Sequence, residues 1–593
     1  SSHSLSPTFL TDPGLEGQMA QIASCAATKG LKDVETEAAS LPRIMRAAAT
    51  AAGGLVEAAA GSLSEAARGK RLLVFTMGSR GDVQPFAALC SGLQDAGFVV
   101  RVLTNVNHVP FMRGFGLDAV ASNIDAEEWI REDPAMLKMM AEGSILRLSK
   151  SLAEKNKIHF PKNFAVQLRE ARDFGPDALL ASGLECTQAQ VFGHVMNLPV
   201  IACHLTAIVP SAQDPSLLGE PGWLPGWCHL LAWRLMMSLF VAGEKDGKHA
   251  VMLEQLPECE PFLARNLEQV TVQSEMHCEP QLCGVSSALI TPRSDWKVQP
   301  VFTGFWVVPR AEQERRMANG DASFGGADFG VLAEFVAGGS APVYIGWGSM
   351  LAVSPEHMAC LAVRSLKEAG LRGVVLGGWA GLSAEKLKGQ PDSKELLAFA
   401  NESVLFVKTA PHEWLFPQCS AIVHHGGSGT TAAALRSGRP SIVTPCGFDQ
   451  FRNAQMVAES GAGVGLPQIS KVNGRALAAA LTKVTADAAL VARAQALGEQ
   501  LRGEDGVGAA VRVLDTFFAE EMATGVWQAK AARKQQAFQE LARPSILTRV
   551  GHCCSYLCGG SAPRQNYVER RSLQVEHKSA YLHIEVLLMW PGK

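Results

Sequence analysis

Short apolar runs, each followed by a glycine-containing turn and a helical stretch, constrain the fold of this 593-residue chain more than any other feature. The first run covers residues 71–76, the turn 78–82 follows it, and a helical pattern over 83–96 leads to a second run at 98–103. This order predicts a strand–helix–strand unit. Because the runs are continuously apolar rather than alternating, they indicate a parallel sheet covered by helices on both faces.

Further units of the same kind follow along the chain. Strands are expected at 177–181 and 200–203, with a helix over 186–196 between them. A second series of five apolar runs alternates with helical patterns, at 342–346, 373–376, 404–407, 421–423 and 441–443. Two such series predict an α/β protein with two Rossmann-like, doubly wound domains.

Changes in local amino-acid composition suggest the domain boundaries. The first residues are rich in Ala and lack strand patterns, and the region between the two series is charged and then rich in Gly, Ala and Asp. A charged helix is expected from about residue 526 to 542. We therefore expect an N-terminal extension over 1–69, a first domain over 70–310, a linker over 311–340, a second domain over 341–520 and a C-terminal helix and tail over 521–593.

Composition excludes several classes of function. The 54 basic and 57 acidic residues give a net charge of −3, so the chain has no basic field for binding nucleic acid. Its 14 cysteines include no CxxC pair, which argues against a zinc ribbon or a thioredoxin-type site. Scattered cysteines in a chain of this size are typical of a reducing compartment, so a cytoplasmic location is expected.

A tryptophan-rich stretch over residues 223–241 comes nearest to a membrane-spanning segment. Pro225, His229 and Arg234 interrupt it, and a charge near the centre of a span is costly. Two interpretations stay open. Its apolar residues lie all around a helix, which favours a buried core helix. Alternatively, its aromatic residues guide a lipid or contact a bilayer, making the protein peripheral to a membrane.

The strongest local signal is a glycine-rich turn over residues 424–431, directly after the apolar run 421–423 and before a helical stretch at 432–436. Backbone N–H groups at a helix start, together with His and Thr side chains, are suited to holding a diphosphate. The sequence matches neither a Walker A loop nor GxGxxG, and a tight turn capped by threonines is the alternative. After the run 441–443, Asp449 and Gln450 pair a carboxylate with an amide, which suits bidentate bonds to sugar hydroxyls.

The run 409–450 resembles the nucleotide-sugar signature of the UDP-glycosyltransferases, in particular that of the sterol 3β-glucosyltransferases. The matching parts are Pro-His-Glu-Trp-Leu-Phe-Pro at 411–417, the double His and glycine turn at 424–431, and Asp-Gln at 449–450. Three further stretches agree in the same order, at 78–85, 289–306 and 344–350. The resemblance covers about residues 70–520.

This resemblance implies the GT-B fold, in which two Rossmann-like domains face each other across a cleft. Residues 70–310 would bind the acceptor and 341–520 the UDP-sugar. The implied reaction inverts the anomeric centre while a hexose, with glucose favoured, moves from the UDP-sugar to a sterol or another hydrophobic hydroxyl acceptor. UDP-glucose would be a co-substrate, and neither a cofactor nor a bound metal is expected, because helix dipole, His and hydroxyls would stabilise the leaving diphosphate.

Residue roles follow from the same resemblance. Asp82 is the expected general base, with helix capping as the alternative. Ser349 would reach the diphosphate, His425 would contact its phosphates, and Asp449 and Gln450 would bind the sugar. The expected donor-binding set is Ser349, His425, Gly426, Gly427, Ser428, Gly429, Thr430, Thr431, Asp449 and Gln450; the nucleotide side is Ala410, Pro411 and His412; the turn supporting the base is Gly78, Ser79, Arg80 and Gly81.

Departures from the family pattern leave the acceptor open. Thr409 stands where the plant secondary-metabolite enzymes have Trp, which disfavours that branch and favours the sterol-like one, and Glu413 stands where relatives usually have Asp, a mild change. The stretch 204–210 differs from the one that sterol enzymes often carry at this position. The same chemistry on a soluble polycyclic or polyketide aglycone is therefore an alternative, and a non-catalytic GT-B protein that binds a nucleotide sugar or a lipid is another.

Overall fold

The computed structural model describes part of the chain. Within it the chain divides into two units, residues 1–532 and 533–593. Residues 1–62, most of the expected N-terminal extension, and 542–593, most of the expected tail, lie outside the described ranges. The described ranges are 63–133, 137, 145–206, 209–216, 220, 222–263, 279–296, 299–326, 328–351, 353–447 and 449–541.

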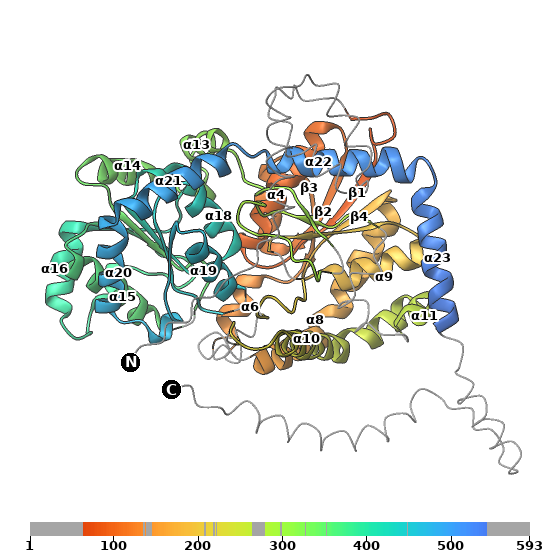
Figure 1. Ribbon diagram of the computed structural model, residues 1–593, viewed down its shortest axis with the longest axis horizontal. Coiled ribbons are helices and arrows are strands. Elements are labelled where there is room, and N and C mark those ends of the chain that lie inside the picture. Colours follow the sequence, from red (N-terminus) through yellow and green to blue (C-terminus); the bar gives the residue numbers. More distant parts are fainter. Residues whose placement is uncertain are drawn as a thin grey trace, which may run out of the picture. The chain divides into compact units, whose positions relative to one another are not determined.

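The first sheet has seven parallel strands in the order β3-β2-β1-β4-β5-β6-β7 (Figure 1). They are β1 Arg71–Phe75, β2 Val99–Asn105, β3 Asp118–Asn123, β4 Ala178–Ser182, β5 Val200–His204, β6 Leu282–Cys283 and β7 Val301–Phe302. The four strands that the apolar runs predict are confirmed. Strand β3 was not predicted, because its sequence Asp-Ala-Val-Ala-Ser-Asn carries too few large apolar residues to stand out.

The second sheet repeats this arrangement with six parallel strands in the order β10-β9-β8-β11-β12-β13. They are β8 Val343–Gly346, β9 Gly373–Leu376, β10 Val404–Val407, β11 Ala421–His424, β12 Ser441–Val443 and β13 Gly463–Gly465. All five predicted strands form. In both sheets the strand order reverses beside the first strand, at β1/β4 and at β8/β11, and ligands of open α/β sheets bind at such switch points.

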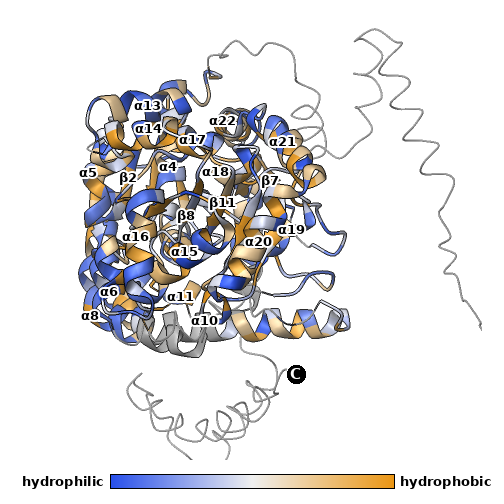
Figure 2. Cartoon of the chain, turned by 90° about the vertical axis from the view of Figure 1, so that its left-hand side faces the viewer, coloured by the Kyte–Doolittle hydropathy of each residue, from blue (hydrophilic) through white to orange (hydrophobic). Residues whose placement is uncertain are grey.

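Helices cover both faces of each sheet (Figure 2). In the first sheet Val74 lies between Val102 and Leu180 in the strand register, and all three are fully buried. In the described part of the first half, the α-helices are α4 Arg80–Ala96, α5 Val109–Gly114, α6 Ala126–Glu132, α8 Ile145–Phe174, α9 Cys186–Met196, α10 Gly226–Gln255 and α11 Glu260–Leu263. Helix α9 has the predicted bounds, and α4 begins three residues earlier than its apolar pattern.

In the second half the helices are α13 Arg310–Ala318, α14 Phe329–Ala337, α15 Pro355–Ala369, α16 Ser393–Ser403, α17 His412–Leu415, α18 Ser428–Arg436, α19 Gln450–Glu459, α20 Gly474–Ala486, α21 Ala488–Arg502, α22 Gly506–Thr516 and α23 Val526–Leu541. The expected charged helix near the C-terminus is thus α23. Helices α13 and α14 occupy the expected linker, so this Gly- and Ala-rich region contains regular structure.

After the second sheet the chain returns to the first core. Helix α22 packs against α4 (Figure 1), where a side-chain Cβ on Gly92 would lie 2.2 Å from Val507 Cγ1. Leu514 and Phe518 are buried in the same apolar cluster as Leu72 and Phe86. Leu63 and Ala67, which belong to the expected extension, are buried there too. The first core therefore draws on segments from both sides of the boundaries that the sequence suggests.

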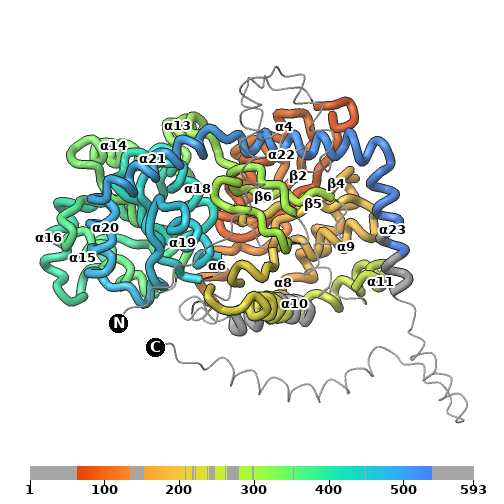
Figure 3. The backbone as a smooth tube through the Cα atoms, in the orientation of Figure 1, coloured from red at the N-terminus to blue at the C-terminus, as the bar shows by residue number. Residues whose placement is uncertain are grey.

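Helices α8 and α10 pack along each other (Figure 3). The tryptophan-rich stretch at the start of α10 divides between two environments. Trp233 is buried, whereas Trp223 and Trp227 are 81% and 67% exposed, so the interpretation of the whole stretch as a core helix is wrong for these two side chains. Among the helices in the described part of the chain, none is long and apolar enough to cross a membrane.

The return of α22 generates a stability prediction. Leu514→Ala removes a fully buried side chain from the first core, and we expect the free energy of unfolding to fall by about 2–5 kcal/mol. Arg512→Ala, on the exposed face of the same helix, should change it by less than about 0.5 kcal/mol. Urea denaturation followed by circular dichroism measures both. Equal transition midpoints for the two variants would contradict the packing of α22 in this core.

Candidate functional site

The glycine turn after β11 opens helix α18. Gly426 has φ +91°, a conformation that favours glycine, and Gly427 is the N-cap. Because Gly427 has no side chain, nothing at the cap position accepts from the N–H groups of the first turn. Those N–H groups and the positive end of the helix dipole stay available to an anion. The residues Ser428, Gly429, Thr430 and Thr431 form this first turn, as the sequence predicts.

The two adjacent histidines of this turn have different surroundings. His424 Nδ1 accepts a hydrogen bond from the N–H of Gly426 at 3.1 Å, which holds the turn. The His425 ring is fitted closely between two glycines. A Cβ would lie 2.4 Å from its Nε2 if placed on Gly427 and 2.9 Å from its Cε1 if placed on Gly348. His425 is therefore the one that lies at the glycine turn and beside the end of β8.

One ring nitrogen of His425 has no partner in the described structure. His425 is 7% exposed, and this nitrogen, Nδ1, is buried. Burial lowers the pKa of His425 to about 4, so the ring is neutral near pH 7 and carries one N–H donor. A buried polar atom without a partner is costly, and a ligand oxygen would satisfy it. This geometry fits the predicted phosphate contact, which stays a prediction.

Ser349 lies in the turn that follows β8, the strand paired with β11. The preceding Gly348 has φ +58°, and its carbonyl accepts from the N–H of Trp379 at 3.0 Å. Below the turn, Trp347 is fully buried and donates from Nε1 to Thr444 Oγ1 at 2.8 Å. The structure thus places Ser349, half-buried, next to the His425 ring at the switch point of the second sheet.

Asp449 stands directly before helix α19 and points toward α18. Its Oδ2 accepts from Ser428 Oγ at 3.1 Å and from Asn453 Nδ2 at 3.3 Å. Asn453 also donates to the carbonyl of Gly426 at 2.7 Å, so it ties the acid to the glycine turn. Asn453 was not predicted, although its position four residues after Asp449 on a helix is the signal that could have found it.

Gln450 is oriented differently from the sequence expectation. It is 3% exposed, and its Oε1 accepts from the N–H groups of Cys446 and Gly447 at 2.8 and 3.1 Å. Its Nε2 lies 3.1 Å from Met350 Sδ. In this conformation the amide supports the loop after β12, while Asp449 offers the carboxylate. The sugar-binding role of Gln450 stays a prediction and would require this amide to change partners.

Asp82 occupies the third position of helix α4, after the turn that ends β1. The N–H and Oγ of Ser79 both donate to its Oδ2, at 2.7 and 2.8 Å, which completes a capping box. Gly78 has φ +125°, and a Cβ there would lie 2.5 Å from the same oxygen. The capping alternative is therefore present in the structure. Capping and catalysis are compatible, because the capping bonds converge on one carboxylate oxygen, and the base role stays a prediction.

Two residues that the sequence did not single out, and Arg80, which it did, hold this turn. Asn105 Oδ1 accepts from the N–H of Gly78 at 2.9 Å, and His108 Nε2 lies 3.1 Å from the Gly78 carbonyl. Arg80 donates to the carbonyl of Ser323 and lies over the Phe324 ring at 4.9 Å. Arg80 therefore fastens the turn to the segment between the two sheets, which is its predicted supporting role.

The starts of α4 and α18 face each other. A Cβ on Gly429 would lie 3.3 Å from the carbonyl oxygen of Gly81. Asp82 and Asp449 approach closely enough to interact. Burial, and then the negative charge of Asp82, raise the pKa of Asp449 to about 6, and burial raises the pKa of Asp82. Two acids, a neutral histidine and an open helix start thus gather where the two sheets' switch points meet.

The expected nucleotide side, Ala410, Pro411 and His412, lies at the end of β10. Thr409 Oγ1 donates to the carbonyl of Ala322 at 2.7 Å, so this segment contacts the region between the sheets. The His412 ring stacks on Phe416 at 4.4 Å, and burial lowers the pKa of His412 to about 3. The structure brings this segment near the site, and its contact with a base stays a prediction.

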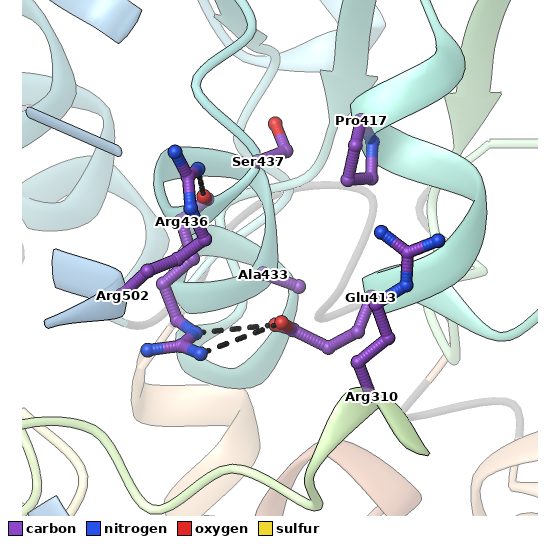
Figure 4. A pocket seen from close by; sticks show the side chains of 7 residues that line it. All are labelled: Arg310, Glu413, Pro417, Ala433, Arg436, Ser437 and Arg502. Carbon is purple, nitrogen blue, oxygen red and sulfur yellow. Dashed lines mark hydrogen bonds and ion pairs between the residues drawn. The ribbon is translucent and has the colours of Figure 1, made fainter. Parts of the chain in front are cut away.

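A pocket of about 210 Å³ lies at the opposite, C-terminal end of α18 (Figure 4). Inside it Arg436 forms an ion pair with Glu413 at 3.3 Å, and Arg436 Nη1 donates to the carbonyl of Leu501 at 2.7 Å. Glu413, which replaces the usual Asp of the family pattern, therefore joins α17 to α18. The pocket is lined by Arg310, Glu413, Pro417, Ala433, Arg436, Ser437 and Arg502 and is separate from the glycine turn.

Comparisons with known proteins agree with this geometry. The family profile "Erythromycin biosynthesis protein CIII-like, C-terminal domain" matches residues 382–505, which include the glycine turn and Asp449. A sterol 3-beta-glucosyltransferase of Yarrowia lipolytica is 28% identical over 447 residues, 74% of this chain and 28% of that protein. The sterol 3-beta-glucosyltransferase UGT80B1 of Arabidopsis thaliana is 26% identical over 506 residues, 83% of this chain and 74% of that protein.

The crystal structure of the glycosyltransferase of kitacinnamycin superposes with a TM-score of 0.52 at 17% identity, covering 75% of this chain and 98% of that one. This chain has the GT-B fold. Its relatives are glycosyltransferases, and they include the sterol 3-beta-glucosyltransferases that the sequence resembles. The chain spans less than a third of the length of the Yarrowia relative.

Within the described ranges, no group of three or more His, Cys, Asp or Glu side chains is arranged to hold a metal ion. The expectation that the reaction needs neither metal nor cofactor stays a prediction.

The fit of His425 against Gly427 generates a prediction. Gly427→Ala places a Cβ 2.4 Å from His425 Nε2, so the ring must move away from the helix start. If His425 contacts phosphate, UDP should bind about ten- to a hundredfold more weakly by isothermal titration calorimetry, because a hydrogen bond to a charged group is lost. Gly330→Ala, where an added Cβ meets nothing, is the control. Unchanged UDP affinity in Gly427→Ala would show that His425 does not contact the phosphates of UDP.

Proposed function

We propose that the protein is an inverting glycosyltransferase that moves a hexose, with glucose favoured, from a UDP-sugar to a hydroxyl of a sterol or another lipid-like acceptor. The observation that carries this proposal is the facing pair of helix starts, one bearing Asp82 and the other an uncapped glycine turn beside His425. The names of the relatives support the donor and acceptor classes.

In the proposed reaction the acceptor oxygen attacks the anomeric carbon from the face opposite the diphosphate. The new C–O bond forms as the bond to the β-phosphate oxygen breaks, and UDP leaves as an anion. Asp82 accepts the hydroxyl proton, and a buried carboxylate with a raised pKa is a better base than a solvated one. The N–H groups at the start of α18 and the neutral His425 stabilise the charge that develops on the diphosphate.

Asp449 orients the donor sugar in this scheme. Its second oxygen can accept from sugar hydroxyls while Oδ2 stays bonded to Ser428 and Asn453. Holding the sugar by a fixed carboxylate limits its rotation, which aligns the anomeric carbon with the acceptor. We further propose that the protein works in the cytoplasm as a peripheral membrane protein and needs neither a metal nor a cofactor.

The first test measures UDP release from UDP-glucose across sterols, long-chain alcohols, and flavonoid or polyketide aglycones. We expect sterol- or lipid-dependent release that Asp82→Asn lowers by about a hundredfold or more, as expected for loss of a general base. If UDP is released only with the soluble aglycones, the acceptor is a soluble aglycone and the proposed lipid acceptor is wrong. Binding of UDP-glucose without turnover of any acceptor would favour the non-catalytic alternative.

A matched variant separates the two roles of Asp82. Ser79→Ala removes the hydroxyl partner of the capping box and leaves the carboxylate in place. It should lower stability by about 1 kcal/mol while UDP release stays near the wild-type rate. If Ser79→Ala lost activity as completely as Asp82→Asn, the carboxylate would matter only as a helix cap.

The pKa of Asp449 generates a pH prediction. Because this pKa is raised to about 6, the carboxylate becomes protonated as the pH falls through 6 and is then a weaker acceptor. Between pH 7 and pH 5 the affinity for UDP-glucose should fall about fivefold, the difference between a charged and a neutral hydrogen bond. Isothermal titration of the wild type and Asp449→Asn measures it, and the variant should lose this dependence. The same pH dependence in both proteins would assign it to another group.

A further inference from the structure

The start of helix α10 carries an exposed apolar face. Trp223, in the preceding turn, is 81% exposed and Trp227 is 67% exposed. About one turn further along, Leu230 and Leu231 are 37% and 59% exposed. Trp227, Leu230 and Leu231 share one side of helix α10, and Trp223 lies in the turn just before this helix. We call these four residues the tryptophan face. Solvent-facing helix surfaces normally carry polar residues at such positions.

The opposite side of the same helix is firmly packed. His229, Trp233 and Met236 are 2%, 4% and 7% exposed, and they follow the same helical spacing. Because one side of the helix is fixed in the core, the tryptophan face points outward as part of a defined structure. Its exposure does not come from loose packing of the helix.

A buried polar network beneath the face fixes its direction. His229 Nδ1 lies 3.0 Å from Glu220 Oε1, and Glu220 also accepts from the N–H and Oγ of Ser216, both at 2.7 Å. Trp233 Nε1 donates to the carbonyl of Asp214 at 3.4 Å. Hydrogen-bonded buried groups of this kind specify one arrangement, so the side that faces water is specified as well.

The charge of this segment favours a lipid surface over a protein. Between residues 221 and 243 the sequence contains no Asp, Glu or Lys, and its one charged residue is Arg234. Arg234 is exposed and continues the spacing of Trp227, Leu230 and Leu231. Tryptophan has an apolar ring and a polar N–H that suit the boundary between headgroups and acyl chains, and arginine extends toward phosphates.

The face belongs to the acceptor half of the proposed site. The segment that contains Trp223 follows β5, at the strand edge that also carries the turn of Asp82. Asp214 in this segment pairs with Arg293 at 2.7 Å and with Arg452 at 3.9 Å. Arg452 lies on α19 beside Asn453, the residue that holds Asp449. The segment that precedes helix α10 is thus connected to the donor side through the ion pair of Asp214 with Arg452.

We propose that the tryptophan face docks the protein on the surface of an anionic lipid bilayer, with Trp223 and Trp227 in the interface and Arg234 at the phosphates. The choice of a bilayer rests on the proposed lipid acceptor, whereas the docking itself does not require catalysis. Such docking would hold the acceptor half at the membrane that contains the acceptor.

Vesicle sedimentation tests this proposal on the full chain. The assay compares vesicles of phosphatidylcholine alone with vesicles that also contain about 30% phosphatidylserine. We expect the double variant Trp223→Ser/Trp227→Ser to partition at least tenfold more weakly than wild type into both. Arg234→Glu should weaken binding to the anionic vesicles more than to the neutral ones. Val331→Ser, an exposed valine on α14, is the matched control and should bind as wild type.

Two further measurements keep this result distinct from the catalytic proposal. With a detergent-dispersed acceptor, wild type and the double variant should release UDP at equal rates. If wild type releases no UDP with this acceptor, the result counts against the proposed function and not against the docking proposal. Brominated lipids should quench wild-type fluorescence more than that of the double variant. Equal vesicle binding by wild type and the double variant, or no binding by wild type, would overturn the docking proposal. Analytical ultracentrifugation gives a further check: if wild type forms a concentration-dependent dimer and the double variant does not, the face is a dimer interface and the docking proposal is overturned.

Discussion

The contact between two helix starts is the constraint on which the rest of the site depends. Gly429 at the start of α18 lies against the backbone of Gly81 at the start of α4, so the positive dipole ends of the two helices come together, an arrangement that is unfavourable by itself. Each end is offset by an acid, Asp82 on α4 and Asp449 through Ser428 on α18. Burial, and then the negative charge of Asp82, raise the pKa of Asp449, so the two acids and the helix starts form one electrostatic unit.

Much of this site could be predicted because its residues directly follow strands. In a doubly wound sheet the carboxyl ends of the strands meet at one edge, so the position of the glycine turn after 421–423 predicts a ligand site there, whereas the base role of Asp82 was implied by the family resemblance. The tertiary partners could not be predicted in this way. Asn453 and His108 act through distant backbone groups, and Gln450 bonds inward to its own loop, which neighbouring letters in the sequence do not reveal.

The fold was predictable for the same reason and to a similar extent. Nine apolar runs became strands, whereas β6 and β7, with two residues each, are too short to give a pattern. The tryptophan stretch shows the limit most clearly, because an even distribution of apolar residues predicts burial on all sides. A polar network around His229 buries one side and leaves Trp223 and Trp227 in solvent. Local composition carries no information about which side a neighbouring segment covers.

The return of α22 to the first core has a consequence for synthesis on the ribosome. Leu514, Phe517 and Phe518 complete a cluster whose other members begin at Leu63, so more than four hundred residues separate the two parts of one core. N-terminal domains usually fold as they emerge during translation. Here the part of this cluster that Leu514, Phe517 and Phe518 complete stays unfinished until the whole second sheet has been made. The nascent chain therefore exposes apolar surface of the first core for most of its elongation. Chaperone binding would matter most during this period.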